Sequence, residues 1–286
     1  MPIAVFTKIL AFLMCLTQSS AIEPSWTDDK QVNKGHASTE VFCDVGWIGP
    51  GQTFNIVVLL TPDKGWHVYW KNPGISGTPT EFEINAPDGF IIGEPMFPRP
   101  AVFHNDEGPT YGYHQPVAIF IPVTAPHTLD DGTVTFQVTT SWLSCRKICV
   151  MGEQTKEVSC SIHVSDHGPL HRDLRLSRWR DKLPPPISVL KEGKTHRSGN
   201  TLHISGTSDL RPIHFLGVER VGVRFDHPEP LVSQGTSFRL PVPLILDFGA
   251  VDGEPLVIEG LLTFGRNQDD PAYVVHIIVT PEDDFR

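Results

Sequence analysis

Short runs of alternating polar and apolar residues dominate this chain, and Gly, Pro or Asp separates one run from the next. Alternation with a period of two is the pattern of a strand with one buried face, and short strands at such intervals are typical of antiparallel sandwiches. The chain therefore predicts an all-β fold. The expected strands are 54–60, 66–70, 81–84, 117–121, 133–140 and 157–164, then 202–205, 213–218, 222–225, 238–246, 256–264 and 273–279.

The two groups of strands are separated by a segment with a different pattern. Within 170–183, Leu176, Trp179 and Leu183 fall near one helical face, and three prolines at 184–186 end the run. A chain of 286 residues can form two ordinary domains. We therefore expect β-sandwich domains at 22–165 and 191–286, joined by a short helical linker at 166–190.

Residues 1–21 have the composition of a secretory signal peptide that is cleaved on export. Lys8 gives a weakly positive start, residues 9–16 form an apolar core too short to span a bilayer, and Ser19, Ser20 and Ala21 fit a cleavage site. No later run is apolar enough to cross a membrane, so we expect a soluble exported protein. The net charge of −10 argues against nucleic-acid binding, which needs clustered Lys and Arg.

Cys145 and Cys149 stand four positions apart, with Arg146 and Lys147 between them. Basic neighbours favour the thiolate, which is the reactive form of cysteine. A disulfide that closes so short a loop contributes only about 2 kcal/mol in the chain-entropy model, so it can be opened and closed at little cost. We interpret the two as a redox pair. A structural disulfide or half of a metal site remains the alternative.

Cys43 and Cys160 are the other two cysteines of the mature chain, because Cys15 lies in the signal peptide. An even number of cysteines in an exported protein indicates pairing. A Cys43–Cys160 bond would close a loop of more than a hundred residues, worth about 5 kcal/mol before strain. We predict a structural disulfide here, with two buried free thiols as the alternative.

Several aromatic and titratable residues are candidates for covering or modulating the cysteine pair. In a strand, Trp66 and Trp70 would share one face and Tyr69 the other. These residues either pack the core or form an aromatic cap over the disulfide. The remaining candidates are Tyr111 and Tyr113, in a Gly- and Pro-rich stretch at 95–116 that we expect to be a loop, and Glu153, His67 and His114.

We expect neither a metal centre nor a cofactor. His163, His167 and His171 stand four apart, but Gly168 and Pro169 would interrupt the helix needed to bring them together. The two thiolates with Met151 form a weak candidate for Cu(I), which soft ligands select. This copper-binding module remains an alternative function, as does a non-catalytic binding module with structural disulfides.

Four ordered blocks carry a family resemblance: residues 65–74 (GWHVYWKNPG), 76–80 (SGTPT), 111–113 (YGY) and 141–149 (SWLSCRKIC). Together they resemble the periplasmic N-terminal domain of the thiol:disulfide interchange protein DsbD, in the branch of the suppressor-of-copper-sensitivity protein ScsB. The resemblance is good over residues 38–185 and weaker beyond them. It implies immunoglobulin-like domains in the periplasm, with Cys145 and Cys149 as the active-site pair. It also implies that Cys149 forms the intermolecular bond and Cys145 resolves it.

The resemblance also implies partners. A domain of this kind accepts electrons from a membrane-embedded, electron-conducting thiol protein and passes them to oxidised periplasmic thiol proteins, including those with a thioredoxin fold. Full-length members continue into a transmembrane domain and a thioredoxin-like domain, whereas this sequence ends at Arg286. We therefore expect a separate electron donor and an activity of the protein-disulfide reductase type, with the direction of electron flow left open.

Overall fold

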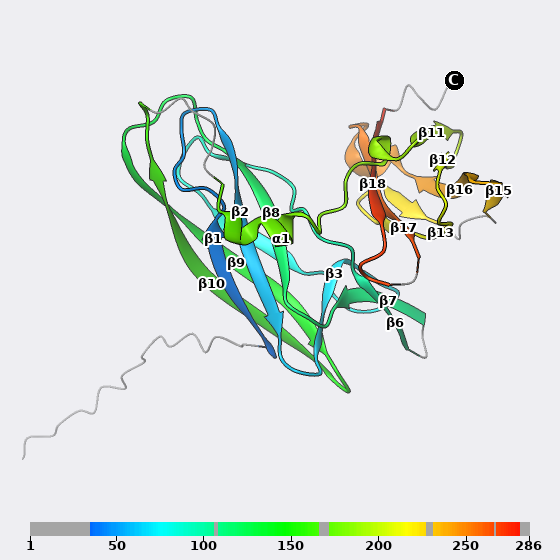
Figure 1. Ribbon diagram of the computed structural model, residues 1–286, viewed down its shortest axis with the longest axis horizontal. Helices are drawn as coiled ribbons and strands as arrows, with labels where there is room; N and C mark the ends of the chain where they lie inside the picture. The colour runs from blue at the N-terminus through cyan, green and yellow to red at the C-terminus, as the bar shows by residue number, and fades with distance from the viewer. Residues whose placement is uncertain (1–34, 106–107, 166–171, 227–230, 266, 281–286) are drawn as a thin grey trace, which may run out of the picture. The chain divides into compact units, whose positions relative to one another are not determined.

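The computed structural model describes residues 35–105, 108–165, 172–226, 231–265 and 267–280, and the predicted signal peptide at 1–21 lies outside them. Most of the described chain forms antiparallel β-strands, which confirms the predicted all-β class (Figure 1). Residues 32–286 group into one compact unit. The division into two domains at 166–190 therefore stays a prediction.

Two sheets form the first sandwich. One has the strand order β1-β2-β8-β5, and the other has the order β10-β9-β3-β7-β6 with β4 paired to β9. The strands are β1 (Ala37–Cys43), β2 (Thr53–Pro62), β3 (His67–Gly74), β4 (Glu81–Asn85), β5 (Ile91–Ile92), β6 (Ala101–Asn105), β7 (Gly108–Tyr113), β8 (Val117–Thr124), β9 (Gly132–Cys145) and β10 (Cys149–Ile162).

The second group of strands also forms two sheets. One has the order β11-β12-β16-β14 with β15 paired to β16, and the other has the order β13-β17-β18. The strands are β11 (Lys194–Ser198), β12 (Thr201–Thr207), β13 (Pro212–Val218), β14 (Val223–Phe225), β15 (Val232–Gln234), β16 (Ser237–Leu246), β17 (Leu256–Phe264) and β18 (Ala272–Val279); a 3₁₀ turn, η3 (Phe248–Val251), precedes β17.

The hydrophobic cores form because the strands alternate buried and exposed residues. The core of the first sandwich continues into β13, β17 and β18, through Leu216, Val218, Leu261 and Ala272. Strand β9 buries every second residue from Val134 onwards, and Phe136 packs against Phe54 of the facing sheet with ring centroids 6.0 Å apart. Trp70 and Trp142 are among the largest fully buried side chains. Strands β9 and β10 pair continuously over 14 residues each, so they form one long hairpin (Figure 1).

Two expectations from the sequence are wrong in detail. The loop expected at 95–116 contains the hairpin β6–β7, because residues 101–105 and 108–112 pair with each other. The helical segment expected at 170–183 contains, in its described part from residue 172 onwards, only η1 (Leu174–Leu176) and α1 (Ser177–Arg180), and η2 (Ile187–Val189) follows it. The segment is held by tertiary contacts, so it needs little helix of its own.

A buried carboxylate attaches this segment to the first sandwich. Asp44 is fully buried and accepts hydrogen bonds from the Asn55 backbone N–H at 2.7 Å and the Asn55 amide at 2.8 Å. Its Oδ2 also accepts from Arg172 at 2.5 Å and Arg180 at 2.9 Å. Leu176 packs beside these contacts, on Val57, Ala118 and Phe120.

Cys43 and Cys160 lie together in the first sandwich. Cys160 is 3% exposed and Cys43 is partly buried. A hydrogen bond between the two thiols raises the pKa of Cys160 well above its ordinary value, and burial raises it further. Both residues are free thiols in this structure, so the predicted disulfide is not formed in it. The contact nevertheless brings the two sulfurs together, as that disulfide would require.

Replacing Asp44 with alanine should destabilise the protein by about 3 kcal/mol, because it leaves two arginines and Asn55 without their common acceptor. The unfolding free energy from urea titration measures this. Arg175→Gln is the matched control, since Arg175 pairs with Asp173 while 84% exposed, where solvent screens the ion pair and little stability is lost with it. An equal loss of unfolding free energy in both variants would contradict the role given to Asp44.

We propose that Cys43 and Cys160 become disulfide-bonded in an oxidising compartment. Alkylation of the oxidised, denatured protein without reductant should then leave both cysteines unlabelled, and mass spectrometry of their peptides measures this. A graded reductant should open Cys145–Cys149 first, because Cys160 is buried in the core. Full labelling of Cys43 and Cys160 before any reductant is added would show that they remain thiols.

Candidate redox site

The disulfide predicted at Cys145 and Cys149 is present and lies at the turn of the long hairpin. Strand β9 ends at Cys145 and β10 begins at Cys149, so the two cysteines face each other as the last cross-strand pair. The turn between them is tightened by a hydrogen bond from the Arg146 N–H to the Ile148 carbonyl at 3.0 Å. The four-residue spacing is thus the spacing of a hairpin turn.

The two cysteines differ in exposure. Cys145 is 4% exposed, because β3 pairs along this end of β9, with His67 opposite Cys145 and Val68 opposite Ser144. Cys149 is exposed at the start of the edge strand β10. An incoming thiolate can therefore reach the sulfur of Cys149 more easily than that of Cys145.

Tyr69 contacts the buried sulfur directly. Its hydroxyl donates a hydrogen bond to Cys145 Sγ at 3.3 Å, and its side chain is buried. The segment 76–80 holds Tyr69 in place, because Thr80 Oγ1 donates a hydrogen bond to the Tyr69 carbonyl at 2.6 Å. Gly77 has φ of 109°, and a Cβ there would lie 2.7 Å from the Tyr69 ring. Glycine is therefore required for both the backbone conformation and the space.

His67 and Phe103 extend the site on the same face of the sheet. The Phe103 ring stacks on His67 with centroids 4.5 Å apart, and His67 lies edge-on to Tyr69 at 5.4 Å. Burial, followed by the nearby charge of His114, lowers the pKa of His67. At neutral pH, this lowered pKa favours the uncharged form of the imidazole opposite Cys145.

Phe103 was not predicted from the sequence. It lies in β6, within the Gly- and Pro-rich stretch that predicts a loop. The signal that could have found it is the pairing of 101–105 with 108–112, which places Phe103 opposite Thr110. Thr110 and Gly112 share one face of β7, because they stand two residues apart. Gly112 lies opposite Tyr69, so Phe103 lies on the same face of the sheet as Tyr69.

Three predicted cap residues lie on the other face of this sheet. Trp70 and Tyr113 are buried in the core, and the Tyr113 hydroxyl donates to the Pro98 carbonyl at 2.7 Å. Tyr111 lies edge-on to Trp70 at 6.4 Å. Burial raises the pKa of Tyr111, and that of Tyr113 much further. These three side chains pack the core, because strand alternation turns them away from the face that carries Cys145.

The other predicted residues have mixed placements. Trp66 stacks on His36 with centroids 3.7 Å apart, in the turn before β3, where Gly65 lies beside the Arg146 side chain. Glu153 accepts a hydrogen bond from Ser141 at 3.3 Å. It lies four residues along β10 from Cys149, which is about 13 Å in a strand, so its carboxylate does not reach the sulfurs. His114 lies edge-on to Phe103 at 6.0 Å.

Metal ligands do not gather in the part of the chain that the structure describes, where no group of three or more His, Cys, Asp and Glu side chains could hold an ion. The ring centroids of His163 and Trp47 lie 6.2 Å apart, whereas His167 and His171 fall outside the described residues. Met151 follows Cys149 on the same face of β10 and is 48% exposed. Among the described residues, no helix is long and apolar enough to cross a bilayer.

Comparisons with known proteins agree with this geometry. Residues 37–159 match the family described as "Thiol:disulfide interchange protein DsbD, N-terminal". The crystal structure of the N-terminal periplasmic domain of ScsB from Proteus mirabilis is similar in fold, with a TM-score of 0.53 and 16% identity, and the match covers 86% of this chain and 94% of that one.

A protein of unknown function from Porphyromonas gingivalis W83 is 10% identical, with 86% of this chain and 100% of that one covered, but its TM-score of 0.26 is too low to support an argument. No curated protein sequence matches the chain. The family match covers both cysteines and the redox hairpin up to residue 159 of β10, and the match to ScsB shows the same fold. Residues 37–159 are therefore similar to the family of DsbD N-terminal domains, and the chain has an ScsB-like fold.

Proposed function

We propose that this protein exchanges disulfides with periplasmic thiol proteins, relaying reducing equivalents from a separate membrane-embedded donor to oxidised clients. The observation that carries the proposal is the asymmetric disulfide at the hairpin turn, with Cys149 exposed and Cys145 buried under Tyr69. A structural bond closing so short a loop would contribute little stability. The match of residues 37–159 to the DsbD N-terminal family supports thiol-disulfide chemistry in this compartment.

In the first half-reaction, a thiolate of the donor attacks Cys149 Sγ. The Cys145–Cys149 bond breaks, an intermolecular disulfide forms at Cys149, and Cys145 leaves as a thiolate. The Tyr69 hydroxyl is already placed to donate to that thiolate, and neutral His67 lies opposite it. The donor's second thiolate then attacks its own bridged sulfur and releases Cys149. One donor dithiol has become a disulfide, and one disulfide of this protein has become a dithiol.

In the second half-reaction, the Cys149 thiolate attacks the disulfide of an oxidised client. A mixed disulfide forms at Cys149, and Cys145 attacks Cys149 Sγ to release the reduced client and restore the internal bond. Two electrons pass to the client, which takes up two protons in total. The exposed side chains of Ile148 and Met151 beside Cys149 give a partner an apolar contact surface.

Aromatic side chains cover the buried half of the disulfide. Tyr69 contacts Cys145, His67 lies opposite it, and Phe103 stacks on His67. We propose that this cover slows attack by small thiols that lack a docking surface. The cap expected at Tyr111 and Tyr113 is thus assigned instead to Phe103 and His67.

Single-cysteine variants test the order of attack. Cys145→Ser retains the exposed Cys149 and should form a mixed disulfide with a chromogenic aromatic disulfide about ten-fold faster than Cys149→Ser, which retains the buried Cys145. Stopped-flow absorbance measures the rates, and peptide mapping confirms the labelled cysteine. Trapping from periplasmic extract should likewise favour Cys145→Ser. Faster reaction of Cys149→Ser would reverse the assigned roles.

Removing the Tyr69 hydroxyl should make the pair harder to reduce. The hydrogen bond to the Cys145 thiolate stabilises the reduced form, so Tyr69→Phe should lower the reduction potential by about 30 mV, or about 1.4 kcal/mol. Equilibration with a glutathione buffer measures the potential. Tyr273→Phe in β18 is the matched control and should leave it unchanged. A wild-type value well below about −300 mV would indicate an inert structural bond and contradict the relay.

A further inference from the structure

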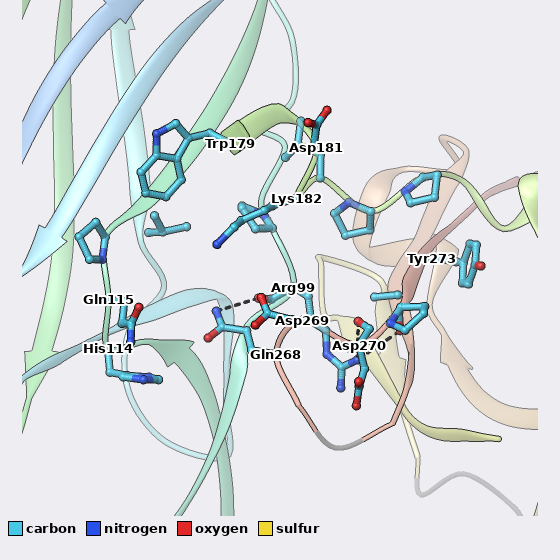
Figure 2. Close-up of a pocket in the computed structure, with 18 residues that line it drawn as sticks. Arg99, His114, Gln115, Trp179, Asp181, Lys182, Gln268, Asp269, Asp270 and Tyr273 are labelled. Carbon is cyan, nitrogen blue, oxygen red and sulfur yellow. Dashed lines mark hydrogen bonds between the residues drawn. The ribbon is translucent and has the colours of Figure 1, made fainter. Parts of the chain in front are cut away.

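Arg99 joins the first sandwich to the connection between β17 and β18. It is 8% exposed and lies just before β6. Its Nη1 donates to the carbonyl oxygens of Phe264 at 2.5 Å, Asp270 at 2.9 Å and Pro271 at 3.2 Å, and its Nη2 donates to Gly265 at 3.3 Å. In return, the Gln268 amide donates to the Arg99 carbonyl at 3.2 Å. Figure 2 shows Arg99 and Gln268 at a cleft of about 510 Å³.

The chemistry of this contact is specific to arginine. Burial lowers the pKa of Arg99, and the charge of Asp270 opposes that effect only in part. A buried cation held mainly by neutral carbonyls is costly, so the contact requires a group with several donors in a fixed plane. Lysine has the charge but presents its donors from one point, and it could not reach four carbonyls in this arrangement.

The strand that carries Tyr69 is tied to the same part of the chain. Lys71, two residues after Tyr69, forms an ion pair with Glu259 of β17, and the Asn72 amide donates to the Gly217 carbonyl of β13. Arg220 donates to the other oxygen of Glu259 at 2.7 Å. Burial alone would raise the pKa of Glu259, but Lys71 and Arg220 together lower it. Strands β13, β17 and β18 thus hold two strands of the redox site.

Hairpin β6–β7 starts at this attachment. Phe103 is only four residues after Arg99, and it reaches the disulfide through His67. Any shift at Arg99 therefore changes the position of the Phe103 ring over His67. Lys71 and Asn72 fix the position of His67, on which Phe103 stacks, because all three residues lie on β3.

We infer that the sheet β13-β17-β18 supports the redox site, and that Arg99 is a positioning residue that acts through Phe103. The contact between Arg99 and the β17–β18 connection holds Phe103 against His67, and thereby sets how readily small thiols reach Cys145–Cys149. This inference rests on the proposed function, since it assumes that the disulfide reacts with thiols and that Phe103 covers it.

A double-mutant cycle separates this role from simple stabilisation. We would compare the wild type with Arg99→Met, Phe103→Ala and the double variant, at a temperature where circular dichroism shows every protein folded. The measurement is the second-order rate constant for reduction of Cys145–Cys149 by glutathione. Phe103→Ala should raise the rate about five-fold to ten-fold, and Arg99→Met about three-fold or more. The double variant should be no faster than Phe103→Ala.

If the rate increases of the two single variants multiply in the double variant, the inference is overturned, because Arg99 would then not act through Phe103. An unchanged rate in Arg99→Met with a raised rate in Phe103→Ala would overturn the inference and leave the proposed cover intact. An unchanged rate in Phe103→Ala would overturn both. Where Arg99→Met does not fold, Arg99→Lys replaces it. This variant should also raise the reduction rate, since it keeps the charge but loses the planar guanidinium group that donates to several carbonyl oxygens. Arg175→Gln is the matched control and should behave as wild type.

Discussion

The pairing of β3 with the end of β9 is the interaction on which the redox site depends. It places His67 opposite Cys145 and buries that sulfur, while Cys149 stays exposed on the edge strand. Alternation along β3 then assigns each neighbour to a side. His67 and Tyr69 face the sulfurs, whereas Val68 and Trp70 enter the core. One sheet thus contributes a chemical face and a packing face from consecutive residues of the same strand.

The sequence blocks that carry the family resemblance have separate physical tasks around this pairing. Residues 145–149 form the hairpin turn that brings the sulfurs together, and residues 76–80 fix Tyr69 through Thr80 and the space left at Gly77. Lys71 and Asn72 contact β17 and β13. The chemistry therefore uses few residues, and most of the motif serves to hold them in position.

Buried charges connect the segments of this β-protein. Asp44 holds the segment after β10 through Arg172 and Arg180, and Arg99 holds the β17–β18 connection through carbonyl oxygens. Removing one partner of such a contact leaves a charge buried without compensation, so each contact favours one arrangement over alternatives of similar apolar packing. Asp44 also follows Cys43 directly, which places the second thiol pair next to this attachment.

The sequence by itself determined the β class, most of the strands and the disulfide, because period-two alternation and a cysteine pair at turn spacing are local signals. It placed Trp70 on the face opposite Tyr69 by the same rule, whereas Trp66 lies in the turn before β3. Only the tertiary structure decided that Tyr111 and Tyr113 pack the core, that Glu153 is remote from the sulfurs, and that Phe103 covers His67. It also left Cys43 and Cys160 as thiols in contact. These outcomes depend on register between strands far apart in sequence, and a shift of one residue would turn every side chain to the other face.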